Sequence, residues 1–311
     1  MLKINKLIPK KLSMEKDELV KKHIGYIKMM VDKGGPEKQE YSEFSDFLYE
    51  IQMLKANGIF LEKELTEIRK AFKDTLSKET IQGFIYLKPH GYSGDFEIID
   101  KIYLSDISDN PKYRNWDIYA HTLDATIAVR NRKKYFKNIF GEKINKTTSL
   151  SILNIASGPS RDIYEFYAEN PNKSITIDCV ELDKNAIEYS KNLLNGHKVN
   201  FINENIFRFA TTKMYDVVWS AGLFDYFSDS VFIKILQRLI SWTKLGGEII
   251  VGNFSTNSKA QPYMEFIEWK LNYRTQEHLM ELALKAGARK NQIQINQEPL
   301  GVNLFLHIKK V

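Results

Sequence analysis

Short apolar runs alternate with helical stretches from residue 150 to the end of the chain, and this alternation limits the possible folds more than any other sequence feature. Strands separated by helices favour a mostly parallel sheet with helices on both faces. We therefore expect an α/β domain over residues 147–311. The predicted strands cover residues 150–156, 174–182, 199–202, 215–220, 248–254 and 301–308.

The first half of the chain has a different periodicity. Apolar residues recur at three- and four-residue spacing, as at Phe44, Phe47, Leu48 and Ile51, which predicts amphipathic helices. A long amphipathic segment at residues 116–140 leads into the first strand. We therefore expect an all-helical cap or substrate domain over residues 1–146.

Residues 88–97 interrupt the helical pattern and read KPHGYSGDFE. A proline and two glycines among polar and aromatic side chains predict a structured loop. Such a loop can present the phenol of Tyr92 and the carboxylates of Asp95 and Glu97 to a ligand. A turn in which Asp95 bonds its own backbone is the competing interpretation.

Composition excludes several classes of site. The single cysteine rules out an internal disulfide framework and a thiolate metal cluster, and the six scattered histidines show no ligand spacing, so we expect no metal. The net charge of +6 permits nucleic acid as a partner without arguing for it. No uninterrupted apolar run lies near the N-terminus, so we expect a cytoplasmic protein without a membrane span.

The first predicted strand runs into the sequence ASGPSR at residues 156–161, and a helix follows from Asp162. A tight turn of small residues before a helix N-terminus lets a polar ligand approach the backbone closely. Only Gly158 matches the three glycines of a dinucleotide fingerprint, so an ordinary strand-to-helix turn explains this segment about as well.

The second predicted strand ends in acidic residues. Glu181 stands at the strand end, about where a Rossmann-type site places a carboxylate on ribose hydroxyls. Asp183 is placed to cap the helix that begins near Asn185, and ribose binding by Asp183 is the alternative.

This order of elements resembles the class I S-adenosylmethionine-dependent methyltransferases from about residue 150 to the C-terminus. The resemblance implies a Rossmann-like seven-stranded sheet whose last strand, near residues 302–308, is antiparallel, and S-adenosyl-L-methionine as cofactor. Asn205, in place of the usual aspartate, and the missing glycines depart from the pattern. By the resemblance the cofactor-binding residues are Ala156, Ser157, Gly158, Glu181, Leu182, Asn205, Ile206, Ser220, Ala221 and Gly222.

A second resemblance covers nearly the full chain. The loop at residues 88–97 and the sequence AVRNR at residues 128–132 resemble a bacterial methyltransferase group assigned to the synthesis of an extracellular factor, 3-hydroxypalmitic acid methyl ester. This resemblance implies carboxyl O-methylation of a 3-hydroxy fatty acid or a similar small carboxylate.

Roles for individual residues follow from the chemistry of methyl transfer, which depends on aligning the nucleophile, the methyl carbon and the sulfur. A carboxylate acceptor needs no general base, whereas an amine or hydroxyl needs one. We predict catalytic roles for Tyr92, Asp95 and His121, and His90 and Asp225 are further conceivable bases.

Two arginines precede the first strand. Arg130 and Arg132 can each pair with the methionine carboxylate or a substrate carboxylate through a bidentate fork, and we choose Arg130 as the cofactor ligand. A solvated basic face is at least as good an interpretation of Arg132.

Substrate contacts are expected near the carboxyl ends of the strands. Asn253 follows the fifth predicted strand, and Tyr273 lies in an aromatic insertion after it, so both join Tyr92 as predicted substrate-binding residues. For Trp269, in the same insertion, packing is the favoured role.

Three other functions stay open on the sequence. An N-methyltransferase of a small amine or peptide is the nearest. An RNA-binding protein or RNA methyltransferase is suggested by the positive charge and the basic stretch at residues 130–146, although no RNA-binding module is recognisable. A catalytically idle scaffold is allowed by the degraded glycine motif. The oligomeric state is not readable from the sequence.

Overall fold

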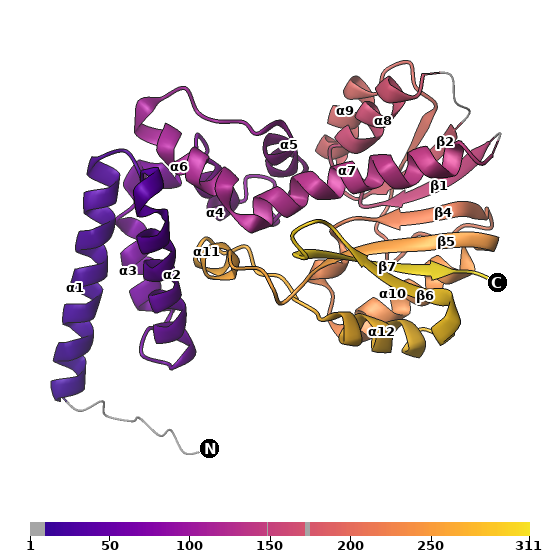
Figure 1. The fold of residues 1–311 in the computed structure, drawn as a ribbon. Helices are drawn as coiled ribbons and strands as arrows, with labels where there is room; N and C mark the ends of the chain where they lie inside the picture. Colours follow the sequence, from indigo (N-terminus) through magenta and orange to yellow (C-terminus); the bar gives the residue numbers. More distant parts are fainter. Residues whose placement is uncertain (1–9, 148, 172–174) are drawn as a thin grey trace. The chain divides into compact units, whose positions relative to one another are not determined.

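The computed structural model describes residues 10–147, 149–171 and 175–311, and the chain folds as two compact units that interleave along the sequence (Figure 1). The helical unit comprises Met1–Ser93, Asp106–Thr122 and Ala260–Trp269. The sheet unit comprises Gly94–Ser105, Leu123–Lys259 and Lys270–Val311. The expected boundary at residue 147 falls between a long helix and the first strand, both of which belong to the sheet unit, and the assignment of roles to the two halves stays a prediction.

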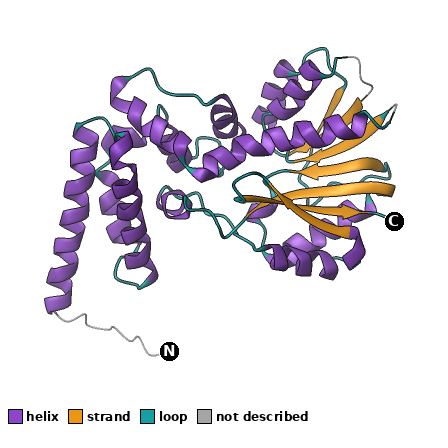
Figure 2. Ribbon diagram, viewed as in Figure 1, coloured by secondary structure: helices purple, strands orange, loops and turns teal. Residues whose placement is uncertain are grey.

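The sheet unit is built on seven strands in the order β3-β2-β1-β4-β5-β7-β6. Figure 2 shows the strands together in one sheet, with helices packed around it. β1, β2, β3, β4 and β5 pair in parallel, whereas β7 is antiparallel to both of its neighbours. The predicted α/β fold with an antiparallel last strand is confirmed. The strands are β1 (Leu150–Ile155), β2 (Ile175–Glu181), β3 (Val199–Asn203), β4 (Tyr215–Ser220), β5 (Thr243–Phe254), β6 (Ile293–Gln297) and β7 (Asn303–Lys309).

Helices cover both faces of this sheet, because the central strands are apolar on both sides. Val217 and Trp219 pack on one face with Phe136 and Phe166, whereas Val218, between them, packs on the opposite face with Leu236. The alternation follows from the two-residue period of a strand. The helices of this unit are α5 (Phe96–Leu104), α7 (Asp124–Ile144), α8 (Arg161–Glu169), α9 (Lys184–Leu193), α10 (Asp229–Ser241) and α12 (Gln276–Lys285).

The helical unit has an aromatic core. Phe44 makes edge contacts with Trp116 and Tyr119, whose ring centroids lie 5.7 and 5.0 Å away, and Tyr263 packs against Tyr119 at 5.7 Å. Trp269 is buried, as its predicted packing role requires. The helices of this unit are α1 (Lys10–Asp32), α2 (Tyr41–Ala56), α3 (Glu62–Lys70), α4 (Ile81–Leu87), α6 (Pro111–Thr122) and α11 (Gln261–Phe266).

Four local predictions differ from the structure. The amphipathic segment at 116–140 is two helices, because the chain leaves helical geometry at Leu123 between α6 and α7. The loop at 88–97 ends at Asp95, which begins α5. β5 begins earlier than expected, at Thr243. β6 was not among the predicted strands, because its sequence IQINQ alternates apolar residues with amides rather than forming an apolar run.

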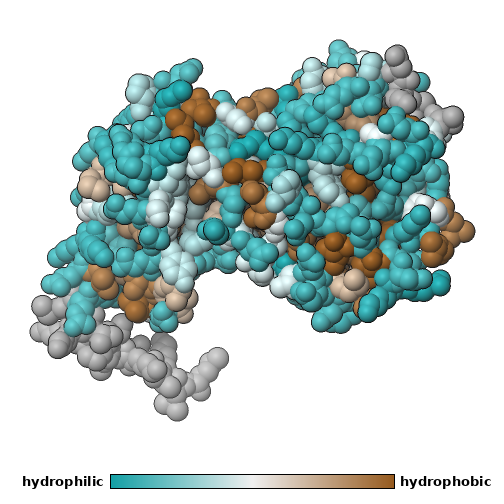
Figure 3. All heavy atoms as spheres, in the orientation of Figure 1, coloured by the Kyte–Doolittle hydropathy of each residue, from teal (hydrophilic) through white to brown (hydrophobic). Residues whose placement is uncertain are grey.

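No helix among the described residues is long and apolar enough to cross a membrane. On the face shown in Figure 3, apolar residues appear as separate patches between polar ones.

Candidate active site at the carboxyl edge of the sheet

The carboxyl ends of β1, β2 and β4 meet at one edge of the sheet, where open α/β folds bind their ligands. Most of the cofactor residues predicted from the sequence end these strands or follow them directly, whereas Asn205 and Ile206 follow β3 and Arg130 lies on α7. Ser220 joins two of the strands, because its hydroxyl donates to the carbonyl of Ile155, 3.1 Å away.

The loop after β1 has an alternating left-handed backbone. Ala156, Gly158 and Ser160 have φ values of 54°, 54° and 53°. Only glycine adopts this conformation without a steric cost. The three positions have the spacing of a glycine-rich turn, and the loop keeps its geometry although two of the glycines are absent.

Glu181, at the end of β2, faces this loop. Its Oε2 accepts from the backbone N–H of Gly158 at 3.0 Å, and its Oε1 accepts from Leu182 and Asp183 at 2.8 and 3.0 Å. Burial raises the pKa of this carboxyl, against the effect of the three backbone donors. Asp183 caps α9 through the N–H of Asn185, 2.8 Å away, so the predicted capping role is confirmed.

Arg132 reaches the same edge from α7. Its side chain is buried, and its Nη1 lies 3.5 Å from the carbonyl oxygen of Ala221. Its Nε is buried without a partner, and no carboxylate of the described residues forms a salt bridge with it. The interpretation of Arg132 as part of a solvated basic face is therefore wrong. The sequence could have indicated this burial. Arg132 lies four residues before Phe136 and eight before Phe140, so all three share the face of α7 that packs in the core.

Three ionisable side chains lie around the Arg132 guanidinium. The hydroxyl of Tyr103 hydrogen-bonds to Arg132, and burial raises the pKa of this phenol to about 12. Burial also raises the pKa of Asp162 to about 6 and of Asp225 to about 7, with Arg132 opposing both shifts. Sequence reasoning missed Tyr103 and Asp162, since neither stands in a recognisable motif.

Tyr103 is held in place because its helix, α5, is anchored to α8. Asp100 on α5 accepts a bidentate pair of hydrogen bonds from Arg161, the first residue of α8. Arg161 also donates to the hydroxyl of Tyr189, 2.8 Å away, and Tyr189 stacks at a tilt on Phe96 with ring centroids 5.6 Å apart.

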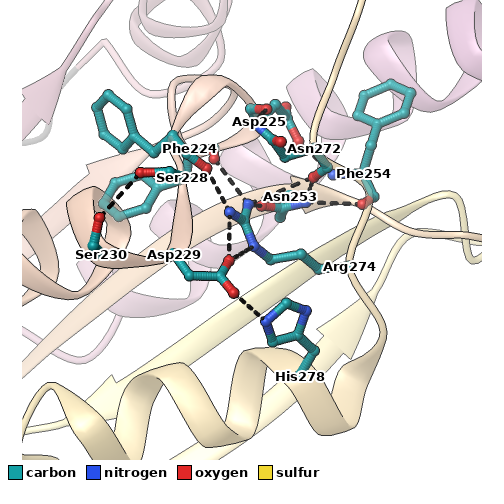
Figure 4. Close-up of polar contacts among 11 residues, drawn as sticks. Phe224, Asp225, Ser228, Asp229, Ser230, Asn253, Phe254, Asn272, Arg274 and His278 are labelled. Atoms are coloured by element: carbon teal, nitrogen blue, oxygen red, sulfur yellow. Dashed lines mark hydrogen bonds and ion pairs between the residues drawn. The ribbon is translucent and has the colours of Figure 1, made fainter. Parts of the chain in front are cut away.

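The loop after β4 is fixed by the buried side chain of Arg274, at the centre of Figure 4. Its Nη1 donates to the carbonyl of Phe224 at 3.1 Å and to Oδ1 of Asn253 at 2.7 Å, and its Nη2 donates to Asp229 at 3.0 Å. Asp225 lies on this loop and accepts from the N–H of Phe254 at 2.6 Å. Arg274 thereby ties the end of β5 to the segment that carries Asp225.

Asn253 is fully buried within this cluster. Its Nδ2 donates to the carbonyls of Phe254 and Asn272, at 2.8 and 3.0 Å, while its Oδ1 accepts from Arg274. Its amide thus supports the loop, and the substrate contact predicted for it stays a prediction.

Three apolar residues on the β3 side of the edge differ in their exposure to solvent. Leu182 is 62% exposed, whereas Ile206 packs in the core and its neighbour Phe207 is 54% exposed. Asn205 accepts from the N–H of Phe207 through its Oδ1, at 2.9 Å. Phe207, which the sequence analysis passed over, presents exposed apolar surface next to Asn205 and Ile206, two of the predicted cofactor-binding residues.

The predicted catalytic residues are divided between the units. Tyr92 and His121 belong to the helical unit, where the Nε2 of His121 lies 2.6 Å from the carbonyl of Asp106. Asp95 belongs to the sheet unit and caps α5 through the N–H groups of Glu97 and Ile98, both 3.0 Å away. The interpretation in which Asp95 bonds the backbone of its own turn is thus confirmed, and the catalytic roles of all three residues stay predictions.

Two further predicted site residues lie in the sheet unit. Arg130 is half-buried on α7, and burial lowers its pKa. Tyr273 packs against Phe254, with ring centroids 6.5 Å apart. Their predicted contacts with cofactor and substrate stay predictions.

The edge fits an S-adenosylmethionine-type ligand by three observations. The Oε2 of Glu181 accepts one hydrogen bond and has a second lone pair for a ribose hydroxyl. No atom lies within 4 Å of a Cβ placed on Gly158, so the loop leaves room for a ligand. Arg132 offers a buried guanidinium whose Nε has no hydrogen-bond partner and which forms no salt bridge with a described carboxylate, so it can pair with a carboxylate-bearing ligand.

Comparison with known proteins identifies solved structures that share the fold of this chain. No protein-family model and no curated protein matches the chain. A protein from Bordetella parapertussis, described as a possible exported protein, shares 14% identity at a TM-score of 0.64, over 98% of this chain and 99% of that one. Magnesium protoporphyrin IX methyltransferase from Synechocystis PCC 6803, with bound SAH, shares 8% identity at a TM-score of 0.51, over 74% of this chain and all of that one.

The sheet has the Rossmann-like methyltransferase fold.

Proposed function

We propose that this chain is an S-adenosylmethionine-dependent methyltransferase acting on a small molecule, and that its acceptor is a carboxylate such as a 3-hydroxy fatty acid. The observation that carries the proposal is the joint presence, at one edge of the sheet, of the left-handed loop at residues 156–160, the strand-end carboxylate of Glu181 and the buried guanidinium of Arg132, whose Nε has no partner.

Each of these groups has a distinct task. Glu181 accepts a hydrogen bond from a ribose hydroxyl. Leu182 and Phe207 offer apolar surface to the adenine ring. Arg132, oriented by Tyr103, binds the methionine carboxylate and so replaces Arg130 as our favoured ligand. The bound cofactor supplies a methyl group activated by its sulfonium. The chain's own contribution is to hold the acceptor oxygen in line with that methyl and to exclude water.

One observation favours a second acceptor class. Asp225 lies on the loop after β4, and burial brings the pKa of this carboxyl to about 7. A general base works best when its pKa lies near the working pH. Asp225 would accept the proton of a hydroxyl or amine acceptor, whereas a carboxylate acceptor has no proton to lose.

A labelled-methyl assay tests the proposal and separates the two acceptor classes. Purified protein is incubated with methyl-labelled S-adenosylmethionine and either 3-hydroxypalmitic acid, its primary amide, or small amines. We expect labelled methyl ester from the acid and none from the amide, at a rate that Asp225→Asn leaves within about threefold. Label in an amine, lost in Asp225→Asn, would replace the carboxylate proposal. Label in no acceptor, with a protein that binds the cofactor, would contradict small-molecule methyl transfer.

A further inference from the structure

A cavity lies at the outer edge of the sheet, away from the candidate active site. It has a volume of about 560 Å³, within the range of small-molecule sites. The cavity borders β6, which stands four strands from β1 in the sheet, or about 19 Å at the usual strand spacing. Its lining comprises Tyr135, Asn138, Ile139 and Glu142 of α7, Gln276 at the start of α12, and Ile295, Asn296 and Gln297 of β6.

A partly buried chain of hydrogen bonds ends at this cavity. The hydroxyl of Tyr135 lies 2.7 Å from the Nε2 of His307, and the Nδ1 of His307 lies 2.7 Å from a carboxylate oxygen of Glu248. Lys143 binds the other oxygen of Glu248. His307 is 5% exposed, and the Tyr135 ring stacks on Phe305 at 3.8 Å. None of these side chains has a task at the candidate active site.

The direction of each hydrogen bond follows from Glu248. Burial opposes its ionisation, but the hydrogen bonds from His307 and Lys143 outweigh burial and hold its pKa at about 2. Glu248 is therefore a carboxylate and only accepts, so the Nδ1 of His307 carries a proton. In a neutral imidazole the Nε2 then accepts, and the Tyr135 hydroxyl donates to it.

The hydrogen bonds that the Tyr135 hydroxyl can still form indicate the kind of ligand. The amide Nδ2 of Asn296 donates to the phenolic oxygen at 3.1 Å and fills one lone pair. The hydroxyl proton is used by His307, so one lone pair of the oxygen remains as an acceptor. A group that donates hydrogen bonds, rather than one that accepts them, completes this arrangement.

The charges of the residues that line the cavity further restrict the chemical class of its ligand. Among the described residues that line the cavity there is no lysine, arginine or histidine, and Glu142 is the one formal charge. Anions find no counter-charge there. Carboxamides and two isoleucines supply the rest of the surface. We propose that this cavity binds a small organic amine, whose ammonium group donates to the hydroxyl oxygen of Tyr135 and is balanced by the carboxylate of Glu142.

The hydrogen-bonded chain fixes the direction in which the Tyr135 hydroxyl donates. Glu248 stays ionised across the neutral range and accepts from the Nδ1 of His307, so the Nε2 of His307 accepts from Tyr135 and the hydroxyl proton does not oppose an ammonium group. The charged groups that face His307 and Tyr135 are Glu248, Lys143 and Glu142.

Titration of the full chain with spermidine, followed by NMR of protein labelled at histidine, tests the proposal. His307→Gln identifies the His307 signals. We expect saturable binding at pH 8 that shifts these signals. Tyr135→Phe, which keeps the stacked ring, should weaken binding about tenfold, the effect of one hydrogen bond to a charged group. Glu142→Gln should weaken it about threefold.

Matched controls keep the outcome decisive. Glu188→Gln makes the same change at an exposed position on α9 and should bind like the wild type. Myo-inositol and citrate replace spermidine as the uncharged and anionic probes. Failure of spermidine to shift the His307 signals would overturn the proposal. Equal binding by wild type, Tyr135→Phe and Glu142→Gln would overturn it too, as would tighter binding of citrate.

Discussion

Gly222 lies against the guanidinium group of Arg132, so closely that a Cβ atom on Gly222 would stand 2.6 Å from Nη1. Gly222→Ala therefore has to displace the guanidinium. We expect this variant to weaken S-adenosylmethionine binding about tenfold or more, the effect of losing a hydrogen bond to a charged group. Calorimetric titration measures the loss. The matched control is Gly141→Ala on α7, where a Cβ meets no atom within 4 Å. Wild-type affinity in Gly222→Ala would show that Arg132 does not bind the ligand.

The left-handed residues of the loop after β1 give a stability prediction. Ala156→Gly and Ser160→Gly each remove a Cβ from a backbone with φ near +54°. Each should stabilise the protein by about 1 kcal/mol in chemical denaturation. Ala168→Gly, the same change within α8, should destabilise it by about 1 kcal/mol. Equal losses at positions 156 and 168 would contradict the geometry of the loop.

Asp225 should make the stability of the folded protein depend on pH. Burial brings its folded-state pKa to about 7, above the value of about 3.9 for the unfolded chain. Between these values the folded state binds more protons, so stability falls as the pH rises from about 4 to 7. Asp225→Asn removes this loss, and its melting temperature should exceed that of the wild type by more at pH 8.5 than at pH 5.5. The same difference at both pH values would mean that Asp225 is not buried as an acid.

Arg274 should be among the residues most sensitive to substitution in the sheet unit. Arg274→Lys cannot reach Phe224, Asn253 and Asp229 together, and it leaves buried acceptors without donors. We expect a loss of about 3 kcal/mol in the free energy of unfolding. Arg208→Lys, at an exposed position, should change stability little. A small effect at Arg274 would contradict its role as the clamp of the loop after β4.

The sequence predicted those parts of the fold that depend on local patterns. The strand runs were predicted because their apolar side chains fill both faces of the sheet, and the cap Asp183 was predicted because its side chain bonds the first turn of the following helix. β6 was not predicted, because this edge strand alternates isoleucines with amide side chains and so contains no apolar run. The fold class needed only the order of these elements.

The candidate site was harder to predict, because it depends on contacts between distant segments. Arg130 and Arg132 are two residues apart and so face nearly opposite sides of a helix, and only the packing of α7 decides which reaches the sheet. Asp100 holds Arg161 from 61 positions earlier in the chain, which no local pattern signals. Glu181 was identifiable, because it stands at a strand end.

Calorimetric titration of the purified protein with S-adenosylmethionine tests the central claim most directly. The account predicts saturable binding by the wild type. It predicts binding weakened at least about tenfold in Glu181→Gln, which retains the size of the side chain but loses the charged acceptor of the ribose hydroxyls. It also predicts unchanged binding in Glu188→Gln. A folded wild-type protein that binds neither S-adenosylmethionine nor S-adenosylhomocysteine would contradict the account and favour a scaffold that retains the fold alone.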